Sequence, residues 1–566
     1  MKQSVIALLL SLSASGVGAS PVPTLILMGG SYRTCSSLLS NDCLAAQREF
    51  PGARGAPQYR MTPSRFAEIL EPDYWQARHG APKRPALQTL LDATHAAVGD
   101  RLLDAESLRA AFQQTDSSVW NALLTQEQDL ILSAFEQLQQ DNGIRKREQV
   151  RIDGGNRPFD AAMFRQLVAE AAKRSPGRKP RVAFTTSASV NGFDAVDFYR
   201  ELFRQAGAEP VWWPVDAALA EARFGGTGGC QFLPAMRRKA FSMLGRERVF
   251  PDLDAEQKAA CADPQALDTV PDDVQAIFLD GGDQWLHYQT FFTRDRTANP
   301  WLRAIRAAFQ RGDLVVAGTS AGAAIQSGKS GMITNGTSVN ALARGAIHAT
   351  YSMPEGCDAA RRCPPGVVED DLTWWHGGGL DLIGPLLVDT HVAERRRELR
   401  LLTLLEKLTH DAETPPLAGI GLDETSALIV RVQADGLQLE AQGQSGVWWF
   451  SPPTPRTVNG SWKAQANYLA PGLVLHWRNG SLHLPDGVPT LAIRQTSTLL
   501  GGDALQPEKL REAIWRMARD GYATTDMANP DVHRLRIKTS TDSRTWQGPQ
   551  DQTGITGLTF EFGPGQ

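Results

Sequence analysis

The sequence lacks an excess of charge of either sign. Its 566 residues include 58 Lys and Arg against 62 Asp and Glu, which gives a formal net charge of −4. A nucleic-acid-binding protein needs a clearly basic domain to neutralise phosphates, so we expect no nucleic-acid partner. Hydrophobic residues make up 42% of the chain and charged residues 21%, which is too apolar for a disordered protein. Composition therefore predicts a globular protein and does not yet indicate a chemistry.

Long apolar runs are also scarce, and the one that stands out lies at the N-terminus. Lys2 precedes an apolar run over residues 5–12, and the small residues 16–19 follow it. This layout is typical of a secretory signal cleaved after Ala19. The run is shorter than the ~20 residues that a membrane-spanning helix needs. We therefore expect residues 1–19 to be a signal peptide and the mature chain to be secreted or periplasmic, without a membrane partner.

The chain has only six cysteines, and they form no Cys-x-x-Cys motif. Zinc sites gather Cys and His at short spacings, and the histidines here do not cluster with the cysteines, so we expect no metal. In an exported protein the cysteines instead predict disulfides. Other connectivities stay open, but the most economical pairing joins sequence neighbours: Cys35 with Cys43, Cys230 with Cys261, and Cys357 with Cys363.

The first part of the chain changes in pattern near residue 50. Within residues 20–49, the segment 23–30 predicts a short buried strand that ends in a pair of glycines. Residues 50–175 show mainly helical periodicity, and Thr125–Gln128 forms a capping box before an apolar stripe. We interpret residues 50–175 as a helical insertion packed on a core, with a functional lid as the alternative.

Residues 176–434 alternate short apolar runs with helical segments. The runs predict strands at 182–186, 210–213, 276–279 and 314–317, and the segments predict helices at 193–207 and 299–311. This alternation predicts an α/β fold with a doubly wound, mostly parallel sheet. Such sheets bind ligands at the carboxyl ends of their strands. We expect this segment and the first strand to form one catalytic domain.

Residues 435–566 have a different pattern. Asp435-Gly436 and Asn479-Gly480 each lie between apolar runs, and these dipeptides are strong signals of β-hairpins. We therefore predict a β-rich C-terminal region, which either continues the main sheet or forms a separate one.

The most specific local motif is Gly-x-Ser-x-Gly at residues 318–322, between a predicted strand and the start of an apolar helix. A nucleophilic serine needs a sharp strand-to-helix turn, because the turn exposes Oγ and brings a backbone N–H close to the developing oxyanion. Small flanking residues leave room for that turn. Ser320 is therefore the candidate nucleophile, and a purely structural tight turn is the alternative.

A serine nucleophile also needs a base and an acid that orients the base. His391 follows the apolar run 387–388 and precedes an Arg-rich segment. His376, His476 and His483 are competing candidates, although their positions are more typical of loops and surface hairpins. The candidate acid is Glu424, at the end of another predicted strand.

Together these motifs resemble the cyanophycinase and dipeptidase E family of serine peptidases. Matching stretches occur in the family's order at 278–284, 317–324, 389–400 and 419–424. The resemblance covers roughly residues 180–430 and the first strand, and it implies a class I glutamine amidotransferase-like, flavodoxin-like sheet without a cofactor. It implies the following roles: Ser320 as nucleophile, His391 as general base, Glu424 as the carboxylate that holds the imidazole, Gly282 and Ala321 as oxyanion-hole donors, and Gln284 as a pocket residue.

The cyanophycinase branch of this family carries Asp-Gln-His and then spaced arginines. This chain has Thr390 in place of the glutamine but keeps the other positions, Asp389, Arg395, Arg397 and Arg400, as candidate substrate-binding residues. Arginine forks bind carboxylates in bidentate fashion, and cyanophycin, an arginyl polyaspartate, presents free carboxylates. The alternative for these arginines is a solvated helix face.

The resemblance implies an exported serine peptidase that hydrolyses cyanophycin to β-Asp-Arg dipeptides through an acyl-enzyme, and a homodimer is left open. Two other functions stay open: a peptidase acting on small aspartyl or isoaspartyl peptides, and a catalytically inactive polymer-binding homologue.

Overall fold

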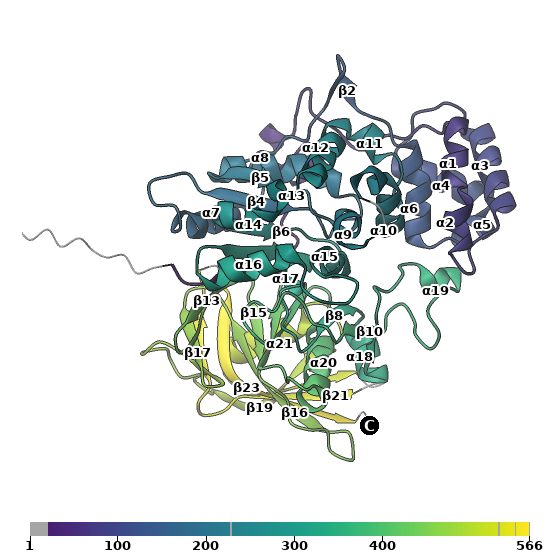
Figure 1. The fold of residues 1–566 in the computed structure, drawn as a ribbon. Helices are drawn as coiled ribbons and strands as arrows, with labels where there is room; N and C mark the ends of the chain where they lie inside the picture. Colours follow the sequence, from purple (N-terminus) through teal and green to yellow (C-terminus); the bar gives the residue numbers. More distant parts are fainter. Residues whose placement is uncertain (1–20, 227–228, 530–532, 550, 565–566) are drawn as a thin grey trace, which may run out of the picture.

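The computed structural model describes residues 21–226, 229–529, 533–549 and 551–564 (Figure 1). The predicted signal peptide, residues 1–19, lies outside the described residues. Two large sheets, each mixing parallel and antiparallel pairs, form the framework of the described part, and helices cover them. The predicted mixed α/β class with a β-rich C-terminal part is confirmed.

One end of the first sheet is parallel, with strand order β5-β4-β6-β7-β1 and β5 at the edge. Side chains of one strand alternate between its two faces: Leu25 and Leu27 enter one hydrophobic core, whereas Ile26 and Met28 enter the other. Both faces are therefore buried, which is why these strands are continuously apolar. The bounds are β1 Thr24–Met28, β4 Arg181–Thr185, β5 Glu209–Trp212, β6 Ala276–Leu279 and β7 Val315–Thr319.

Helices lie on both faces of this sheet. Phe164 and Phe203 pack against one face, and Trp301 and Ile305 against the other. Helix α7 falls inside the range 50–175, yet it packs on the main sheet. The helices of this layer are α7 Pro158–Ala172, α8 Val196–Ala206, α15 Gln284–Phe291, α16 Pro300–Gln310 and α17 Ala321–Ala324. The segment between β5 and β6 adds α9 Ala217–Phe224, α10 Leu233–Phe241, α11 Arg246–Val249, α12 Pro251–Ala262, α13 Pro264–Asp268 and α14 Val270–Asp273.

The first sheet continues beyond β1 with antiparallel strands. Strand β13 pairs with β1, and Ala434 and Asp435 connect β13 in a hairpin to β14, which begins at Gly436. Asn479-Gly480 connects β17 to β18 in the same way. Both predicted hairpins are therefore present, and they lie in the main sheet. The bounds are β13 Ser426–Gln433, β14 Gly436–Gly443, β17 Val474–Arg478 and β18 Ser481–His483.

The second sheet contains the two strands that lead to His391 and Glu424. These strands, β11 and β12, pair in parallel with each other, and β12 pairs with β15 instead of joining the first sheet. Helices α20 and α21 cover this sheet through a separate hydrophobic core. The bounds are β11 Leu386–Thr390, β12 Ala418–Leu422, β15 Val447–Phe450, β16 Trp462–Leu469, β19 Gln495–Gly502, β20 Tyr522–Asn529, β21 His533–Lys538, β22 Arg544–Gln547, β23 Thr553–Pro564, α20 Glu398–Asp411 and α21 Lys509–Asp520.

Smaller elements complete the fold. A three-stranded sheet lies beside the second sheet and consists of β8 Met332–Asn335, β9 Ala346–His348 and β10 Leu372–Trp375, with α18 Ser338–Arg344 and α19 Cys357–Ala360 nearby in the chain. The helical segment before residue 136 has its own core and lies at one end of the molecule (Figure 1). Its helices are α1 Phe66–Ile69, α2 Pro72–Gln76, α3 Arg84–Val98, α4 Ala105–Thr115, α5 Ser117–Asn121 and α6 Thr125–Phe135. A short hairpin follows, with β2 Gln140–Asp141 and β3 Ile144–Arg145.

The capping box predicted at Thr125–Gln128 lies one residue earlier than expected. Leu124 is the N-cap of α6, and its backbone N–H donates to Glu127 Oε2 at 3.0 Å. Glu127 is fully buried and also pairs with Arg362, on the segment after α19. This carboxylate therefore ties the helical segment to the rest of the chain.

The three cysteine pairs are disulfides with the predicted connectivity: Cys35–Cys43, Cys230–Cys261 and Cys357–Cys363. Each closes a loop, and such bonds are compatible with a secreted or periplasmic protein. Within the described residues, none of the helices combines the length and the apolar character needed to cross a membrane.

Candidate active site

Ser320 occupies a sharp turn between β7 and α17. Its φ is +51° and its ψ is −115°, a strained conformation for a residue with a side chain. The flanking glycines permit the turn, because a Cβ at Gly318 would lie 2.2 Å from the carbonyl oxygen of Gly322, and a Cβ at Gly322 would lie 2.2 Å from that of Leu279. The Ser320 N–H donates to the Met28 carbonyl at 2.9 Å. The turn is therefore held by the main sheet and presents the Ser320 side chain at the ends of β1 and β7.

His391 and Glu424 meet Ser320 from the second sheet. The Ser320 Oγ lies 2.7 Å from His391 Nε2, and His391 Nδ1 lies 2.7 Å from Glu424 Oε1. The order of groups is nucleophile, imidazole and carboxylate, which is the geometry of a serine hydrolase triad. Three residues that are far apart in the sequence therefore form one continuous hydrogen-bonded chain.

The electrostatics of this chain favour a neutral imidazole beside an ionised carboxylate. Burial lowers the pKa of His391, and the hydrogen bond to Glu424 opposes this effect. The hydrogen bond from His391 lowers the pKa of Glu424 to about 2, against the effect of burial, and the Ser31 side chain adds to the lowering. His391 is thus ready to accept the Ser320 proton at neutral pH, and Glu424 is ready to stabilise the imidazolium that results.

Gly30 forms the surface against which the His391 ring rests. Its φ is +103°, and a Cβ at this position would lie 2.3 Å from His391 Cε1 and 2.6 Å from Nε2. The sequence pattern predicts Gly29 and Gly30 only as the end of a strand. The glycine pair lies at the carboxyl end of a buried strand, where parallel sheets place their binding sites. This position is the feature of the sequence that could have indicated a functional role for Gly30.

A buried ionic network lies directly behind Glu424. The Glu424 N–H donates to Glu394 Oε2 at 2.8 Å, and Arg511 of α21 donates to Glu394 Oε1 and to Asp423 Oδ2 at 2.5 and 2.9 Å. The Tyr468 hydroxyl donates to the same Asp423 oxygen at 2.7 Å. The C-terminal region therefore holds the backbone of the candidate acid, a contribution that the sequence pattern did not indicate.

The predicted oxyanion donors, Gly282 and Ala321, belong to two backbone segments that come close to Ser320. Ala321 is the first residue of α17, and the first N–H groups of a helix have no acceptor within it. In the other segment, a Cβ at Gly281 would lie 3.4 Å from Ser320 Cβ. The next residue, Gly282, has a φ of +148°, and a Cβ there would lie 2.2 Å from the Ala188 carbonyl oxygen. Two backbone segments thus pass close to the Ser320 side chain.

A fully buried polar cluster holds the loop that contains Gly281 and Gly282. Asp280 accepts the Ala188 N–H at 2.9 Å and the Ser189 hydroxyl at 2.7 Å. His287 contacts the Asp280 carbonyl oxygen through Nε2 and Ser187 Oγ through Nδ1, at 3.0 and 2.7 Å. Burial raises the pKa of Asp280 to about 7 and lowers that of His287 to about 4. This second Ser–His contact is inaccessible, so its role is to fix the loop.

Of the predicted substrate-binding arginines, only Arg395 is largely exposed beside the triad. Its side chain is 51% exposed, and its Nε lies 3.5 Å from Glu424 Oε1. Arg397 donates to the Thr390 carbonyl at 3.1 Å, and burial lowers its pKa to about 9. Arg397 therefore supports the backbone next to His391.

Asp389 and Arg400 lie elsewhere than predicted. They form a buried bidentate pair, with distances of 2.7 and 2.8 Å, and Arg400 also donates to the Gly336 carbonyl. Each satisfies the other's charge away from solvent, so in the structure neither side chain is exposed to a substrate. The pair instead fixes α20 to the strand that ends at His391.

Gln284 also makes internal contacts. Its Nε2 donates to the backbone carbonyls of Ile333 and Thr334 at 2.8 and 3.2 Å, which joins the start of α15 to β8. Among the competing histidines, His376 contacts His348 and His476 pairs across a hairpin with His483. The triad hydrogen bonds belong to His391 instead.

Solved structures that match this chain include one distant likeness to a peptidase. No family model matches the chain. Among solved structures, the chain is similar to the crystal structure of a peptidase from an acI-B1 Actinobacterium, at 17% sequence identity and a TM-score of 0.31. The match covers 56% of this chain and 92% of that chain. A likeness this distant shows neither the family nor the function of this chain.

Proposed function

We propose that this chain is an exported serine peptidase of the cyanophycinase and dipeptidase E type, acting through an acyl-enzyme. The observation that carries the proposal is the chain of two 2.7 Å contacts from Ser320 through His391 to Glu424. Such contacts, together with a strained serine at a strand-to-helix turn, are the arrangement required to activate a hydroxyl for attack on a carbonyl.

The reaction follows from these positions. His391 Nε2 takes the Ser320 proton as Oγ bonds to the substrate carbonyl carbon, and the N–H groups of Gly282 and Ala321 receive the developing oxyanion. Glu424 stabilises the imidazolium, which then gives its proton to the leaving amine. Water, activated by the same imidazole, hydrolyses the acyl-enzyme and restores Ser320.

For the substrate, we propose cyanophycin, a polyaspartate backbone with arginine joined to each β-carboxyl, which would be released as β-Asp-Arg dipeptides. Arg395 supports this choice, because it is an exposed guanidinium next to the triad and suits a substrate carboxylate. A second candidate is a small aspartyl peptide. The internal pairing of Asp389 with Arg400 favours it, since that pairing leaves fewer arginines for a polymer than the sequence suggested.

The test compares the mature chain with its Ser320→Ala variant on insoluble cyanophycin and on short aspartyl peptides, with products identified by mass spectrometry. Release of Asp-Arg dipeptide by the wild type alone is the expected result. Cleavage of the short peptides without dipeptide release would select the second candidate. If a fluorophosphonate probe fails to label Ser320, the peptidase proposal is wrong and an inactive binding protein replaces it.

A further inference from the structure

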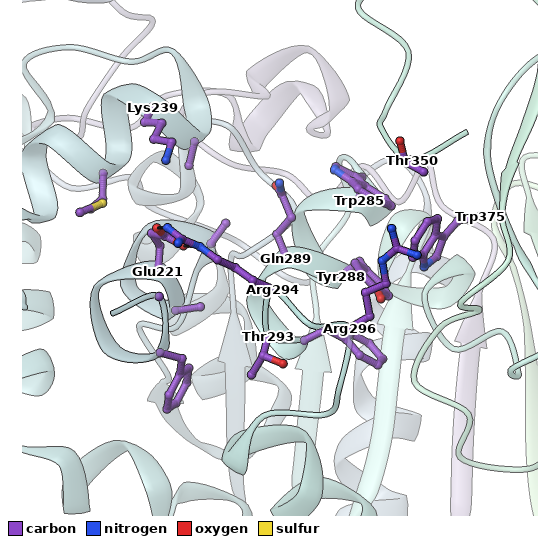
Figure 2. A pocket seen from close by; sticks show the side chains of 17 residues that line it. Glu221, Lys239, Trp285, Tyr288, Gln289, Thr293, Arg294, Arg296, Thr350 and Trp375 are labelled. Atoms are coloured by element: carbon purple, nitrogen blue, oxygen red, sulfur yellow. Dashed lines mark hydrogen bonds and ion pairs between the residues drawn. The ribbon is translucent and has the colours of Figure 1, made fainter. Parts of the chain in front are cut away.

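A pocket of about 410 Å³ is lined by residues outside the triad (Figure 2). Its walls come from α9, α10, α15, the segment that follows α15, and the end of β10. This volume is in the range of pockets that bind small molecules or short peptide segments. None of the roles assigned above uses it.

One wall of the pocket is aromatic. Trp285 and Tyr288 stack with their ring centroids 5.2 Å apart, and Trp375 meets both rings edge-on at 5.4 Å. The guanidinium of Arg296 lies 4.7 Å from the centroid of Trp375. An arginine placed over a ring in this way is already oriented, so less rotamer freedom is lost when it binds a carboxylate.

The charged residues of the pocket are three cations and one carboxylate. Arg294 is bound to the carboxylate, Glu221. The other two cations, Lys239 and Arg296, form no ion pair with any residue of the described chain, and both are exposed. Figure 2 shows them on opposite sides of the pocket, with Gln289 between them. The pocket thus presents two separated positive groups above an aromatic wall.

A short stretch of chain connects this pocket to the nucleophile. Gly281 lies against Ser320, and Trp285, in the pocket wall, is four residues further on. Four residues span at most about 14 Å even when fully extended. The Cα atoms of Gly281 and Trp285 are therefore at most about 14 Å apart, which is the length of about four extended peptide residues.

We infer that this pocket is an accessory subsite for an acidic peptide segment, and this inference rests on the proposed peptidase function. Carboxylates of the segment bind Arg296 and Lys239, and its aliphatic atoms pack on Trp285 and Tyr288. The charge balance selects the ligand, because two cations without acidic partners favour an anionic ligand over a neutral or basic one.

The test measures binding without turnover. Full-length mature protein carrying Ser320→Ala is titrated calorimetrically with N-acetylated tetra-aspartate, and the same protein is then made with Lys239→Gln and Arg296→Gln. Charge-assisted hydrogen bonds are among the stronger contributions to binding. Because the double substitution removes two of them, we expect it to weaken binding at least about tenfold. The matched control is Lys179→Gln, an exposed lysine before β4 and outside the pocket, for which we expect a change of less than about twofold.

Three results would overturn the inference: equal affinity for the double variant and its parent, an equal loss with Lys179→Gln, or equally tight binding of tetra-asparagine. Circular dichroism and thermal unfolding show whether each variant folds, and both pocket substitutions are at exposed positions.

A kinetic experiment separates this inference from the function on which it rests. With Ser320 intact, the pocket variants should raise KM for acidic peptides and leave kcat and fluorophosphonate labelling unchanged. If labelling persists and KM does not change, the inferred role of the pocket as a subsite is wrong and the peptidase proposal stands. If the probe does not label the wild type, the peptidase proposal is wrong. Binding at the subsite is still tested in that case, because the calorimetric measurement uses the Ser320→Ala variant.

Discussion

Replacing Gly30 with alanine tests whether the placement of His391 controls the reactivity of Ser320. The added methyl carbon would lie 2.3 Å from His391 Cε1, whereas an ordinary contact begins near 3.4 Å, so the ring must move by about 1 Å. The Ser320 Oγ and His391 Nε2 are 2.7 Å apart, and such a movement weakens or breaks their hydrogen bond.

The expected loss follows from this displacement. A misplacement of 1 Å costs about 10²-fold in rate, and complete loss of a general base costs about 10²–10⁴-fold. We therefore expect Gly30→Ala to lower both kcat and the rate of fluorophosphonate labelling by at least about 100-fold. The substitution also places a side chain at a φ of +103°, which destabilises the fold by about 1–2 kcal/mol.

Gly52→Ala is the matched control, because Gly52 has a φ of +77° and no atom within 4 Å of an added Cβ. Gly52→Ala places a side chain at a positive φ, as Gly30→Ala does, but the added methyl group does not contact His391. We expect both variants to show similar falls in thermal unfolding temperature and only Gly30→Ala to lose reactivity. Labelling of Gly30→Ala within about threefold of the wild type would refute this account of the site.

Three further predictions follow from the site. Glu424→Gln keeps the shape of the acid but not its charge, so kcat should fall about 10²–10⁴-fold; steady-state kinetics check this, and an unchanged kcat contradicts the triad. Burial lowers the pKa of His391 below 6.5, and Glu424 stays ionised down to about pH 2, so kcat/KM should rise with pH along a limb centred below 6.5; a midpoint at 7 or above opposes this. Arg511→Met leaves Asp423 and Glu394 without their shared cation, so the protein should lose about 3 kcal/mol of stability at pH 7. Burial already raises the pKa of Asp423 to about 7, and a protonated Asp423 needs no cation. The fall in unfolding temperature should therefore be smaller at pH 5 than at pH 7, and equal falls at both would argue against the network.

Features that depend on neighbouring residues could be predicted from the sequence. The turn at Ser320 was recognisable because its two glycines and the flanking apolar runs are local. The hairpins at Asp435-Gly436 and Asn479-Gly480 were recognisable for the same reason. Asn479 and Gly480 form the turn itself with φ values of +50° and +77°, whereas Gly436 is the first residue of β14.

Features that depend on distant contacts were missed or misplaced. Gly30 looked like the end of a strand, and only the folded chain brings it against His391. Arg400 looked like a substrate ligand, but its position on α20 turns it toward Asp389, where both charges are buried. Arg511 gave no signal, because its acidic partners are distant in sequence.

The sequence by itself determined which residue types stand at which strand ends: a serine in a glycine turn, a histidine before an arginine cluster and a glutamate after an apolar strand. Only the tertiary structure decided that they meet. Ser320 extends from the first sheet, whereas His391 and Glu424 follow parallel strands of the second sheet. Their contacts arise because both sheets contribute side chains to one hydrophobic core, in which Val316 of the first sheet lies with Val388 and Ile420 of the second, and that packing joins residues far apart in the chain.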